Sequence, residues 1–327
     1  MSATSSQAPP HWFVLGAGSI GCLYAAYLQR AGITAALLLR DQVRLQQFHD
    51  AGLTLQIDDI HWPVPIAAQV IDPSAATPRI RHLLLCTKAH HSVAAITAIQ
   101  AALAADATVG LLQNGMGVRE ELQPLLPRAT FFHALSTEGA WQPQRFHVMH
   151  AGRGETVVGE VAADETPGRK TSGNAAATDF AAELHRSGLN ARAVADIESR
   201  LWQKLAVNCV INPLTALHRC RNGALLDLPD LSPQLTAICG EITAVAGATG
   251  IALEAAQLSE KVRDVIRGTA ANRSSMLQDI EACRSTEIDY LNGFVVRQAR
   301  RYGIDAAANA HLLAAVNVQE TNTNRQI

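Results

Sequence analysis

Short, mostly apolar runs alternate with amphipathic helical patterns along the first half of the chain. The apolar runs of strand length cover residues 12–15, 33–39, 82–86 and 108–112. The helical patterns that follow three of them cover residues 20–31, 92–103 and 118–126. Continuous apolar runs are typical of parallel strands that are buried on both faces. The pattern therefore predicts an α/β domain with a doubly wound, largely parallel sheet.

The pattern changes near Ile197. From there to Val318 the chain consists of long Ala- and Leu-rich segments with helical periodicity and few strand signals. A chain of 327 residues is also long enough for two domains. We predict a Rossmann-type domain over residues 1–195 and an all-α domain over residues 196–327.

The composition excludes several classes of protein. Hydrophobic residues make up 48% of the chain and charged residues 17%, which is typical of a folded protein with a core rather than a disordered one. The net charge of -2 and the lack of Lys or Arg runs argue against a nucleic-acid or membrane-surface partner. No stretch is long and apolar enough to span a bilayer. An anionic substrate would have to be bound by local groups.

The cysteines and the first ten residues indicate the compartment. The 6 cysteines are scattered and form no C-x-x-C pair, so we expect reduced thiols and no metal site. Residues 1–10 lack both the basic and the apolar region of a secretion signal. These observations predict a cytoplasmic protein.

A glycine-rich loop, Gly16-Ala17-Gly18-Ser19-Ile20-Gly21, follows the first predicted strand and opens the first predicted helix. This context distinguishes a dinucleotide-binding loop from an isolated G-x-G-x-x-G pattern. Gly16 allows a tight turn, Gly18 lets the backbone approach a pyrophosphate, and Gly21 lets helix and strand pack closely. The free N–H groups of the helix N-terminus attract the phosphates. We predict that these six residues bind a dinucleotide, and the alternative is a glycine-rich turn without a ligand.

The residue at the end of the second strand selects the cofactor. NAD enzymes tend to have an acidic residue there, which binds the ribose 2′-hydroxyl. Arg40 stands at this position, and its planar guanidinium suits a 2′-phosphate. We therefore predict NADP, used as NADPH, rather than NAD. Asp41 is the alternative acidic residue, unless it caps the following helix.

Polar residues also follow the next two strands. Lys88 follows the run that ends at Cys86, and Asn114 follows the run that ends at Leu112. Ligands bind at the carboxyl ends of strands in open α/β sheets, so both side chains are candidates for ligand contacts. The alternatives are a solvated loop lysine and a turn asparagine before Gly115.

The most informative segment of the second half is an apolar helical pattern interrupted by a few polar positions. Lys204, Asn208 and Asn212 recur every four residues within it and therefore share one face of the helix. Burying these polar groups is costly without partners, and Pro213 removes the N–H that would bind the carbonyl of Cys209. The combination predicts the wall of a site, and the alternative is a buried structural network.

Lys204 is the natural acid of such a site. Reduction of a ketone needs a hydride at carbon and a proton at oxygen, and an ammonium group near the carbonyl can supply the proton. Partial desolvation would lower the pKa of Lys204 toward the working pH, whereas a nearby carboxylate would raise it.

Two later polar segments, residues 274–281 and 286–293, hold further candidates. These are Ser275, Asp279, Glu287 and Asp289. A continuous helix would place Ser275 and Glu287 about 18 Å apart along its axis, where they could contact different ends of one ligand. The residues alone do not single out Glu287, because acidic side chains are more often solvated or paired with arginine.

Together these motifs resemble those of the ketopantoate reductase (2-dehydropantoate 2-reductase) family. The resemblance rests on Leu201-Trp202-x-Lys204-Leu205-x-x-Asn208-x-x-x-Asn212-Pro213, Ser274-Ser275-Met276-x-Gln278-Asp279 and Thr286-Glu287-Ile288-Asp289-x-x-Asn292-Gly293. It runs from about Phe13 to Arg301. It implies that Lys204 is the general acid and that Glu287 contacts the cofactor and orients the substrate.

Further roles follow from the resemblance alone. It implies that the substrate is bound by Asn114, Asn208, Asn212, Asn222 and Ser275. It also implies that Arg40 and Lys88 form a basic pair that favours NADP, and that Asn114 contacts the cofactor as well. The implied reaction is the NADPH-dependent reduction of 2-dehydropantoate to (R)-pantoate in pantothenate biosynthesis. Another small 2-keto acid is the alternative substrate.

The chain also departs from the family pattern. It begins with an extra polar stretch before Phe13, carries His90-His91 where some members have an aromatic residue, and matches residues 133–139 only loosely. Two rival functions fit less well. Other two-domain dehydrogenases usually have an acidic residue in place of Arg40, and a dinucleotide-sensing regulator would have no need of the stripe that contains Lys204. The sequence leaves a homodimer open as the assembly state.

Overall fold

The computed structural model describes residues 11–71, 80–161 and 175–324. These residues form two compact units. The first unit comprises Met1–Gln113 and Val118–Ile197, and the second comprises Asn114–Gly117 and Glu198–Ile327. Residues 1–10, for which the sequence predicted no secretion signal, lie outside the described residues.

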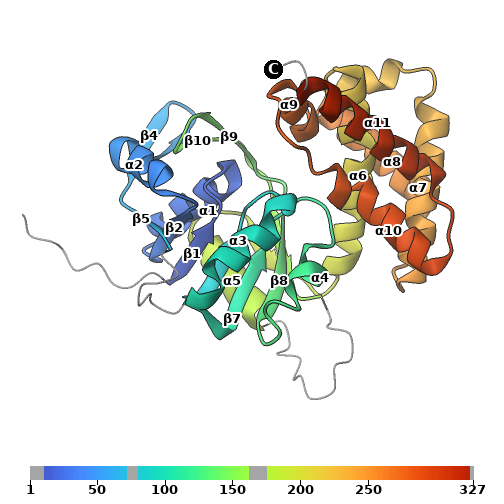
Figure 1. Ribbon diagram of the computed structural model, residues 1–327. Helices are drawn as coiled ribbons and strands as arrows, with labels where there is room; N and C mark the ends of the chain where they lie inside the picture. Colours follow the sequence, from blue (N-terminus) through green and yellow to red (C-terminus); the bar gives the residue numbers. More distant parts are fainter. Residues whose placement is uncertain (1–10, 72–79, 162–174, 325–327) are drawn as a thin grey trace, which may run out of the picture. The chain divides into compact units, whose positions relative to one another are not determined.

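The first unit is built on an eight-stranded sheet within the described residues, with the order β12-β11-β8-β7-β6-β1-β2-β5 (Figure 1). Its strands are β1 (Trp12–Leu15), β2 (Ala35–Leu39), β5 (Ala67–Val70), β6 (Ile80–Leu85), β7 (Leu103–Leu111), β8 (Thr130–Ser136), β11 (Thr156–Gly159) and β12 (Ala191–Ala193). All neighbours pair in parallel except β11 and β8.

The strand order explains where this unit can bind a ligand. The chain passes from β1 outward to β2 and β5, then returns to the other side of β1 and continues through β6, β7 and β8. This is the order of the doubly wound dinucleotide-binding fold, and the direction reverses between β1 and β6. The predicted doubly wound sheet is confirmed.

Helices and a second, smaller sheet complete the first unit. The helices are α1 (Ser19–Arg30), α2 (Gln42–Ala51), α3 (Ser92–Ile99), α4 (Val118–Leu122) and α5 (Ala175–Arg186), with the 3-10 turns η1 (Ala89–His91) and η2 (Gln100–Ala102). The second sheet has the order β4-β3-β10-β9, from β3 (Leu53–Ile57), β4 (Ile60–Val64), β9 (Gly139–Gln144) and β10 (His147–Gly152). It packs against α1.

Two predicted helices of this unit end earlier than expected. The helix expected over residues 118–126 ends at Leu122. The helix expected over residues 92–103 ends at Ile99, and Leu103 already belongs to β7. Residues 101–107 are mostly alanine, which favours a helix. From Leu103 onward they nevertheless form a strand, because β7 pairs with β6, where Leu103 lies opposite Ile80. Pairing within the sheet therefore overrides the local preference.

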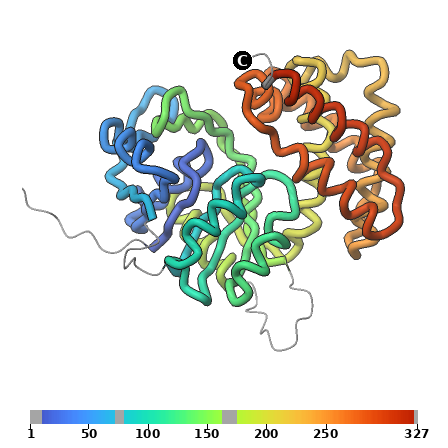
Figure 2. The backbone as a smooth tube through the Cα atoms, in the orientation of Figure 1, coloured from blue at the N-terminus to red at the C-terminus, as the bar shows by residue number. Residues whose placement is uncertain are grey.

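The second unit is helical. Its helices are α6 (Ile197–His218), α7 (Leu231–Ala248), α8 (Ala255–Gly268), α9 (Ser275–Glu281), α10 (Asn292–Tyr302) and α11 (Ala307–Asn324), with the 3-10 turns η3 (Asn222–Asp227) and η4 (Ile288–Tyr290). Both α10 and α11 pack on α7 (Figure 2). The core is formed largely by the apolar faces of α6, α7 and α10, with Trp202 packed against Phe294. The predicted all-α half is confirmed.

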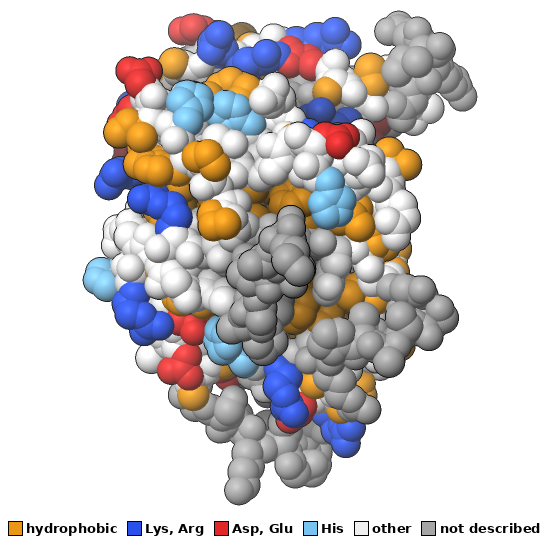
Figure 3. Space-filling model, turned by 90° about the vertical axis from the view of Figure 1, so that its left-hand side faces the viewer, with side chains coloured by type: hydrophobic (Ala, Val, Ile, Leu, Met, Phe, Trp, Pro, Cys, Tyr) orange, Lys and Arg blue, Asp and Glu red, His pale blue; other side chains and the backbone are white. Residues whose placement is uncertain are grey.

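The surface agrees with the low net charge. Basic and acidic side chains are interspersed with hydrophobic and uncharged ones on the face drawn in Figure 3. The six cysteines are all free, and three of them are only partly buried rather than in the core. Within the described part of the chain, no helix is long and apolar enough to cross a membrane.

Candidate active site

The strand register brings the predicted nucleotide-binding residues to one edge of the large sheet. Leu15 at the end of β1 lies opposite Leu38 of β2 and Leu85 of β6. The segments that follow these strands, which include the glycine loop, Arg40 and Lys88, therefore lie along the carboxyl edge of the sheet. This edge flanks the point where the winding direction reverses, which is where such sheets bind ligands.

The glycine loop has the conformation that its spacing predicts. Gly16 has a φ of 109°, and a Cβ there would lie 2.6 Å from the backbone of Cys86. A Cβ on Gly21 would lie 2.0 Å from the Gly16 carbonyl oxygen, so the helix can approach the loop only without a side chain. A Cβ on Gly18 would meet nothing within 4 Å. The space next to Gly18 is therefore open.

The small sheet holds this loop from the side. Gln142 of β9 donates from Nε2 to the Ala17 carbonyl oxygen at 3.2 Å. The sequence did not indicate Gln142, because nothing in its neighbourhood links it to a loop more than a hundred residues earlier. The contact gives the small sheet a direct connection to the predicted phosphate-binding segment.

Arg40 and Asp41 have different tasks. Asp41 caps α2 by accepting a hydrogen bond from Arg44 N at 2.7 Å, and its other oxygen accepts from Arg40 Nε at 2.7 Å. The hydrogen bond from the Arg44 backbone and then the Arg40 side chain hold the pKa of Asp41 below its usual value. Asp41 thus serves as the helix cap that the sequence allowed, while the side chain of Arg40 remains 75% exposed.

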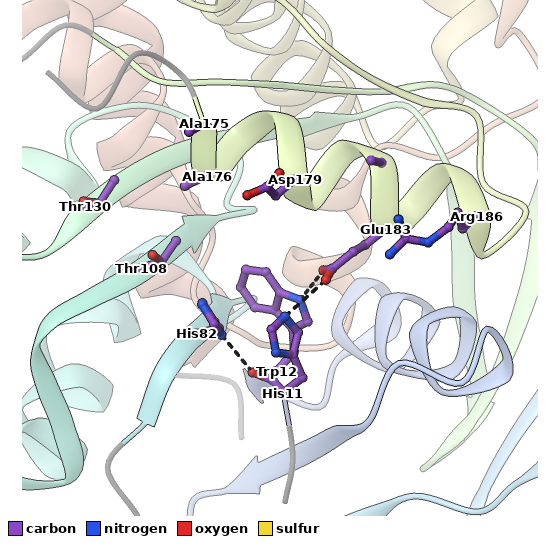
Figure 4. A pocket seen from close by; sticks show the side chains of 11 residues that line it. His11, Trp12, His82, Thr108, Thr130, Ala175, Ala176, Asp179, Glu183 and Arg186 are labelled. Atoms are coloured by element: carbon purple, nitrogen blue, oxygen red, sulfur yellow. Dashed lines mark hydrogen bonds and ion pairs between the residues drawn. The ribbon is translucent and has the colours of Figure 1, made fainter. Parts of the chain in front are cut away.

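A cavity of about 490 Å³ lies elsewhere in the same unit (Figure 4). His11 and Trp12 line it at the start of β1, together with Thr130 at the start of β8. It therefore opens at the amino ends of the central strands, away from the glycine loop. Of its two acidic residues, Asp179 and Glu183, the second already accepts a hydrogen bond from Trp12 Nε1 at 2.5 Å and pairs with His11 at 3.1 Å. This cavity is not the dinucleotide site.

In the second unit, the predicted polar stripe lies on α6. Lys204 and Asn208 are partly buried, and Asn212 is buried with 8% exposed. Burial lowers the pKa of Lys204 to about 8, and the carboxylate of Glu287 acts in the opposite direction. Both effects were expected for a general acid. The electrostatic interaction with Glu287 also distinguishes this carboxylate from the other acidic candidates.

Glu287 is held by residues outside its own segment. The preceding residue, Thr286, donates from its backbone N to Glu320 Oε1 of α11 at 3.0 Å, and its hydroxyl bonds to the same oxygen. Glu287 itself directly precedes η4 as its N-cap residue, and the last residue of η4, Tyr290, donates its N–H to the Glu287 carbonyl at 3.0 Å. The position of Glu287 beside α6 therefore depends on α11.

Asn114 is anchored to the same turn. The segment Asn114–Gly117 belongs to the second unit, although the sequence assigned it to the first domain. Met116 N donates to the Tyr290 carbonyl at 2.9 Å. Gly115 has a φ of 83°, and a Cβ there would lie 2.3 Å from the Tyr290 oxygen. Within the second unit, the segment Asn114–Gly117 is therefore held against the turn that follows Glu287.

Ser275 lies next to a residue that binds α6 close to Asn212, the last residue of the polar stripe. The residue before it, Ser274, caps α9 by accepting from Leu277 N at 3.0 Å. Ser274 also accepts a hydrogen bond of 2.6 Å from the hydroxyl of Thr215, which lies in α6 one turn after Asn212. Ser275 is exposed and opens the helix. The hydroxyl of Ser275 is therefore available at the part of α6 that carries Asn212.

Ser275 and Glu287 do not lie on one continuous helix. The helix α9 ends at Glu281, and the chain then passes through Cys283, whose φ is 52°, before η4 begins at Ile288. A residue in the left-handed conformation cannot continue a right-handed helix. The continuous helix that would separate Ser275 and Glu287 by about 18 Å is therefore not formed.

Asn222, the first residue of η3, is bonded to the segment that precedes α9 and Ser275. Its backbone N donates to Asn272 O at 3.0 Å, and its Nδ2 donates to Thr269 Oγ1 at 2.9 Å, which binds η3 to the segment before α9. Its Oδ1 is buried and accepts no hydrogen bond among the described residues. A buried acceptor without a partner is costly, so a ligand donor at this point would be stabilising.

A buried network repairs the defect that Pro213 creates in α6. The helix continues through Pro213, which leaves the Cys209 carbonyl without its helical donor. Asn292, which is fully buried, donates to that carbonyl from Nδ2 at 3.0 Å and to Asn309 Oδ1 at 3.0 Å. Asn309 donates in turn to Glu241 at 2.7 Å. The sequence predicted the missing bond at Cys209 but not the side chain that replaces it.

The remaining acidic candidates have other surroundings. Asp279 is buried and pairs with Arg284 at 3.1 Å, which is the alternative that the sequence left open. Asp289 is exposed. Of the four candidates in this region, the structure therefore brings Glu287 to Lys204 and leaves Asp279 in a structural ion pair.

Comparison with known proteins identifies this arrangement. The family described as "Ketopantoate reductase PanE/ApbA" matches residues 12–163, and its C-terminal part, "Ketopantoate reductase PanE/ApbA C terminal", matches residues 196–320. The chain belongs to the ketopantoate reductase family. The "2-dehydropantoate 2-reductase" of Vibrio cholerae is 36% identical over 313 residues, which cover 95% of this chain and 98% of that protein. The protein of the same name from Archaeoglobus fulgidus is 33% identical and covers 94% of this chain and 97% of its own length.

Solved structures of ketopantoate reductases have the same fold. The crystal structure of a "PanE/ApbA family ketopantoate reductase" from Ralstonia eutropha is 30% identical, with a TM-score of 0.82 over 95% of this chain and 99% of that one. A D-mandelate dehydrogenase with NADH and anilino(oxo)acetate has a TM-score of 0.86 at 22% identity, covering 96% of this chain and 99% of that one. The second likeness concerns the fold alone.

Proposed function

We propose that this ketopantoate reductase uses NADPH to reduce 2-dehydropantoate to (R)-pantoate, a step of pantothenate biosynthesis. The observation that carries the proposal is Lys204, an ammonium whose pKa burial lowers to about 8 and which interacts with Glu287 on the polar face of α6. A family member needs such an acid for ketone reduction. We further propose that the first unit binds the dinucleotide and that the second binds and protonates the keto acid.

The residues of the first unit fit a phosphorylated dinucleotide. The loop from Gly16 to Gly21 has a tight turn at Gly16 and open space beside Gly18, which suits a pyrophosphate at the N-terminus of α1. Arg40 is exposed at the end of β2 and suits a 2′-phosphate, while Lys88 and Asn114 are proposed as further contacts. When bound, NADPH supplies the hydride that attacks C2 of the keto acid.

The residues of the second unit supply the proton and orient the substrate. Lys204 donates its proton to the oxygen that develops negative charge at C2 and is then reprotonated from water. Glu287 holds the ammonium in position and counteracts the effect of burial on its pKa. We propose that Glu287 also contacts the cofactor.

Amide and hydroxyl groups bind the remaining oxygens of the substrate. We propose Asn208, Asn212 and Ser275 as donors to its carboxylate and hydroxyl groups. The unpaired Oδ1 of Asn222 accepts from a hydroxyl group of the substrate, which removes the cost of a buried acceptor. A shorter 2-keto acid would leave part of these groups unpaired. A cytoplasmic location and a homodimer stay predictions.

The test is to follow NADPH and NADH oxidation with 2-dehydropantoate and with shorter 2-keto acids. We expect the highest kcat/KM for 2-dehydropantoate with NADPH. A fast reaction with another 2-keto acid and none with 2-dehydropantoate would overturn the substrate assignment. Equal use of NADH would overturn the role given to Arg40.

A further inference from the structure

We propose that Arg145 binds the 2′-phosphate of the dinucleotide together with Arg40 and Arg44 and so contributes to the preference for the phosphorylated cofactor. This inference rests on the proposed use of NADPH. Arg145 lies in the turn between β9 and β10, and Arg44 lies in the first turn of α2. The three residues come from two segments of the first unit that lie far apart in the chain, the start of α2 and the β9–β10 turn.

The β9–β10 hairpin reaches α2 at its turn (Figure 1). The ring of Phe146, the residue after Arg145, packs edge-on against the ring of Phe48 in α2, with centroids 5.2 Å apart. Arg44 precedes Phe48 by four residues and therefore shares its helical face. The contact between the two rings places Arg145 next to the start of α2.

The same hairpin also reaches the glycine loop. Gln142 of β9 donates to the Ala17 carbonyl at 3.2 Å. Arg145 therefore lies between two residues that make these contacts. Gln142, three residues before it, binds the glycine loop, and Phe146, the residue after it, packs against α2. Arg40 is close to the same contacts, because it directly precedes Asp41, the residue that caps α2. The hairpin therefore borders the region where an adenosine ribose would lie.

The charges in this region are not balanced. Arg40 and the backbone of Arg44 engage the single carboxylate of Asp41. Partial burial, followed by the positive charges of Arg44 and Arg40, lowers the pKa of the Arg145 guanidinium. Among the residues that the structure describes, three guanidinium groups beside one carboxylate leave two positive charges uncompensated. A phosphate monoester carries about -1.5 to -2 charges at pH 7 and would balance them.

The guanidinium groups also have the geometry for this ligand. Arg40 gives its Nε–H to Asp41, which leaves the outer edge of its fork for an anion. Arg145 is exposed and can turn toward the same anion. Phosphate oxygens accept two parallel hydrogen bonds from one guanidinium, and each additional arginine adds charge-assisted bonds. The ribose 2′-hydroxyl of NAD offers no such partner, so Arg145 should discriminate between the two cofactors.

The experiment measures binding of four ligands to the full chain by calorimetry. These ligands are NADP⁺, NAD⁺, 2′,5′-ADP and 5′-AMP. We expect Arg145→Ala to weaken NADP⁺ and 2′,5′-ADP by about tenfold or more, the loss typical of a hydrogen bond to a charged group. Binding of NAD⁺ and 5′-AMP should change less than about twofold, because neither carries a 2′-phosphate. Arg145→Lys should lose less than Arg145→Ala because it keeps the charge.

Arg192→Ala is the matched control. It removes the same charge from an exposed arginine on β12, at the opposite edge of the large sheet from β5 and its neighbour β2. The inference is overturned when Arg145→Ala weakens NADP⁺ no more than Arg192→Ala does, or when it weakens NAD⁺ equally. A selective loss of NADP⁺ binding in Arg145→Ala, combined with wild-type protein that does not reduce 2-dehydropantoate, would instead contradict the proposed function and leave the role of Arg145 supported.

Discussion

The two units of this protein build their parts of the site in opposite ways. In the first unit the predicted contacts come from backbone N–H groups and from exposed side chains such as that of Arg40. In the second unit they come from side chains on an apolar helix, where Lys204 is partly buried and Asn212 is buried. The first part therefore depends on the absence of side chains, and the second depends on particular functional groups.

This difference predicts how each unit responds to substitution. Adding a methyl group is the most harmful small change in the glycine loop, because the loop positions backbone atoms. Removing a functional group is the most harmful change on α6, because its polar groups are surrounded by apolar residues, which cannot donate a proton or a hydrogen bond in their place. Three experiments test this contrast.

The largest effect is expected for Lys204→Ala. Loss of the general acid should reduce kcat by about 10²–10⁴-fold, while NADPH affinity stays within about twofold because the nucleotide-binding residues are unchanged. Steady-state kinetics and NADPH titration measure the two quantities. Lys261→Ala is the matched control, since Lys261 is a lysine of the same unit that bonds to Gln203 rather than lying on the stripe.

The pH dependence is a second readout of Lys204. The acid must be protonated, and its pKa is lowered to about 8, so kcat/KM for reduction should be constant below that pH and fall above it. The free energy of unfolding changes with pH in the opposite direction to kcat/KM. The folded pKa lies below the unfolded value of 10.5, so the folded chain binds fewer protons and the contribution of Lys204 to stability increases from about pH 8 toward 10.5. A wild-type kcat in Lys204→Ala would refute the assignment.

A smaller effect is expected from alanine at two glycines of the loop. Gly16→Ala forces a Cβ to within 2.6 Å of the Cys86 backbone at a φ of 109°, and should lower the free energy of unfolding by about 2–6 kcal/mol. Gly18→Ala meets nothing within 4 Å, so it should leave stability unchanged and weaken NADPH binding. Urea unfolding and NADPH titration separate the two. Unchanged NADPH affinity in Gly18→Ala would contradict the role of the open space.

The smallest effect is expected for Asn292→Leu, at about 1–3 kcal/mol of unfolding free energy. The substitution removes the donor to the Cys209 carbonyl, which Pro213 leaves without a helical partner. Pro213→Ala restores an N–H at that point, so the loss caused by Asn292→Leu should be smaller in the Pro213→Ala background. A double-mutant cycle measured by urea unfolding tests this. Equal losses in both backgrounds would show that the two residues are not coupled.

Much of the fold and of the site could be predicted because the signals are local. The glycine loop is a short run between a strand and a helix, and the stripe from Lys204 to Asn212 follows from the four-residue spacing on one helix. The missing hydrogen bond at Cys209 follows from Pro213 alone. The choice of Glu287 among the acidic residues came from the family resemblance, because its interaction with Lys204 joins residues far apart in the chain.

The sequence by itself therefore determined the change from an α/β half to a helical half, the glycine loop between β1 and α1, and the polar face of α6, all of which depend on neighbours within a few residues. Only the tertiary structure decided that Leu103 starts a strand, that Asn292 replaces the helical donor at Cys209, and that Arg145 joins the basic residues near Arg40. Each of these depends on sheet pairing or packing between distant segments. Local propensity carries no information about such contacts, because they are made only when the chain is folded.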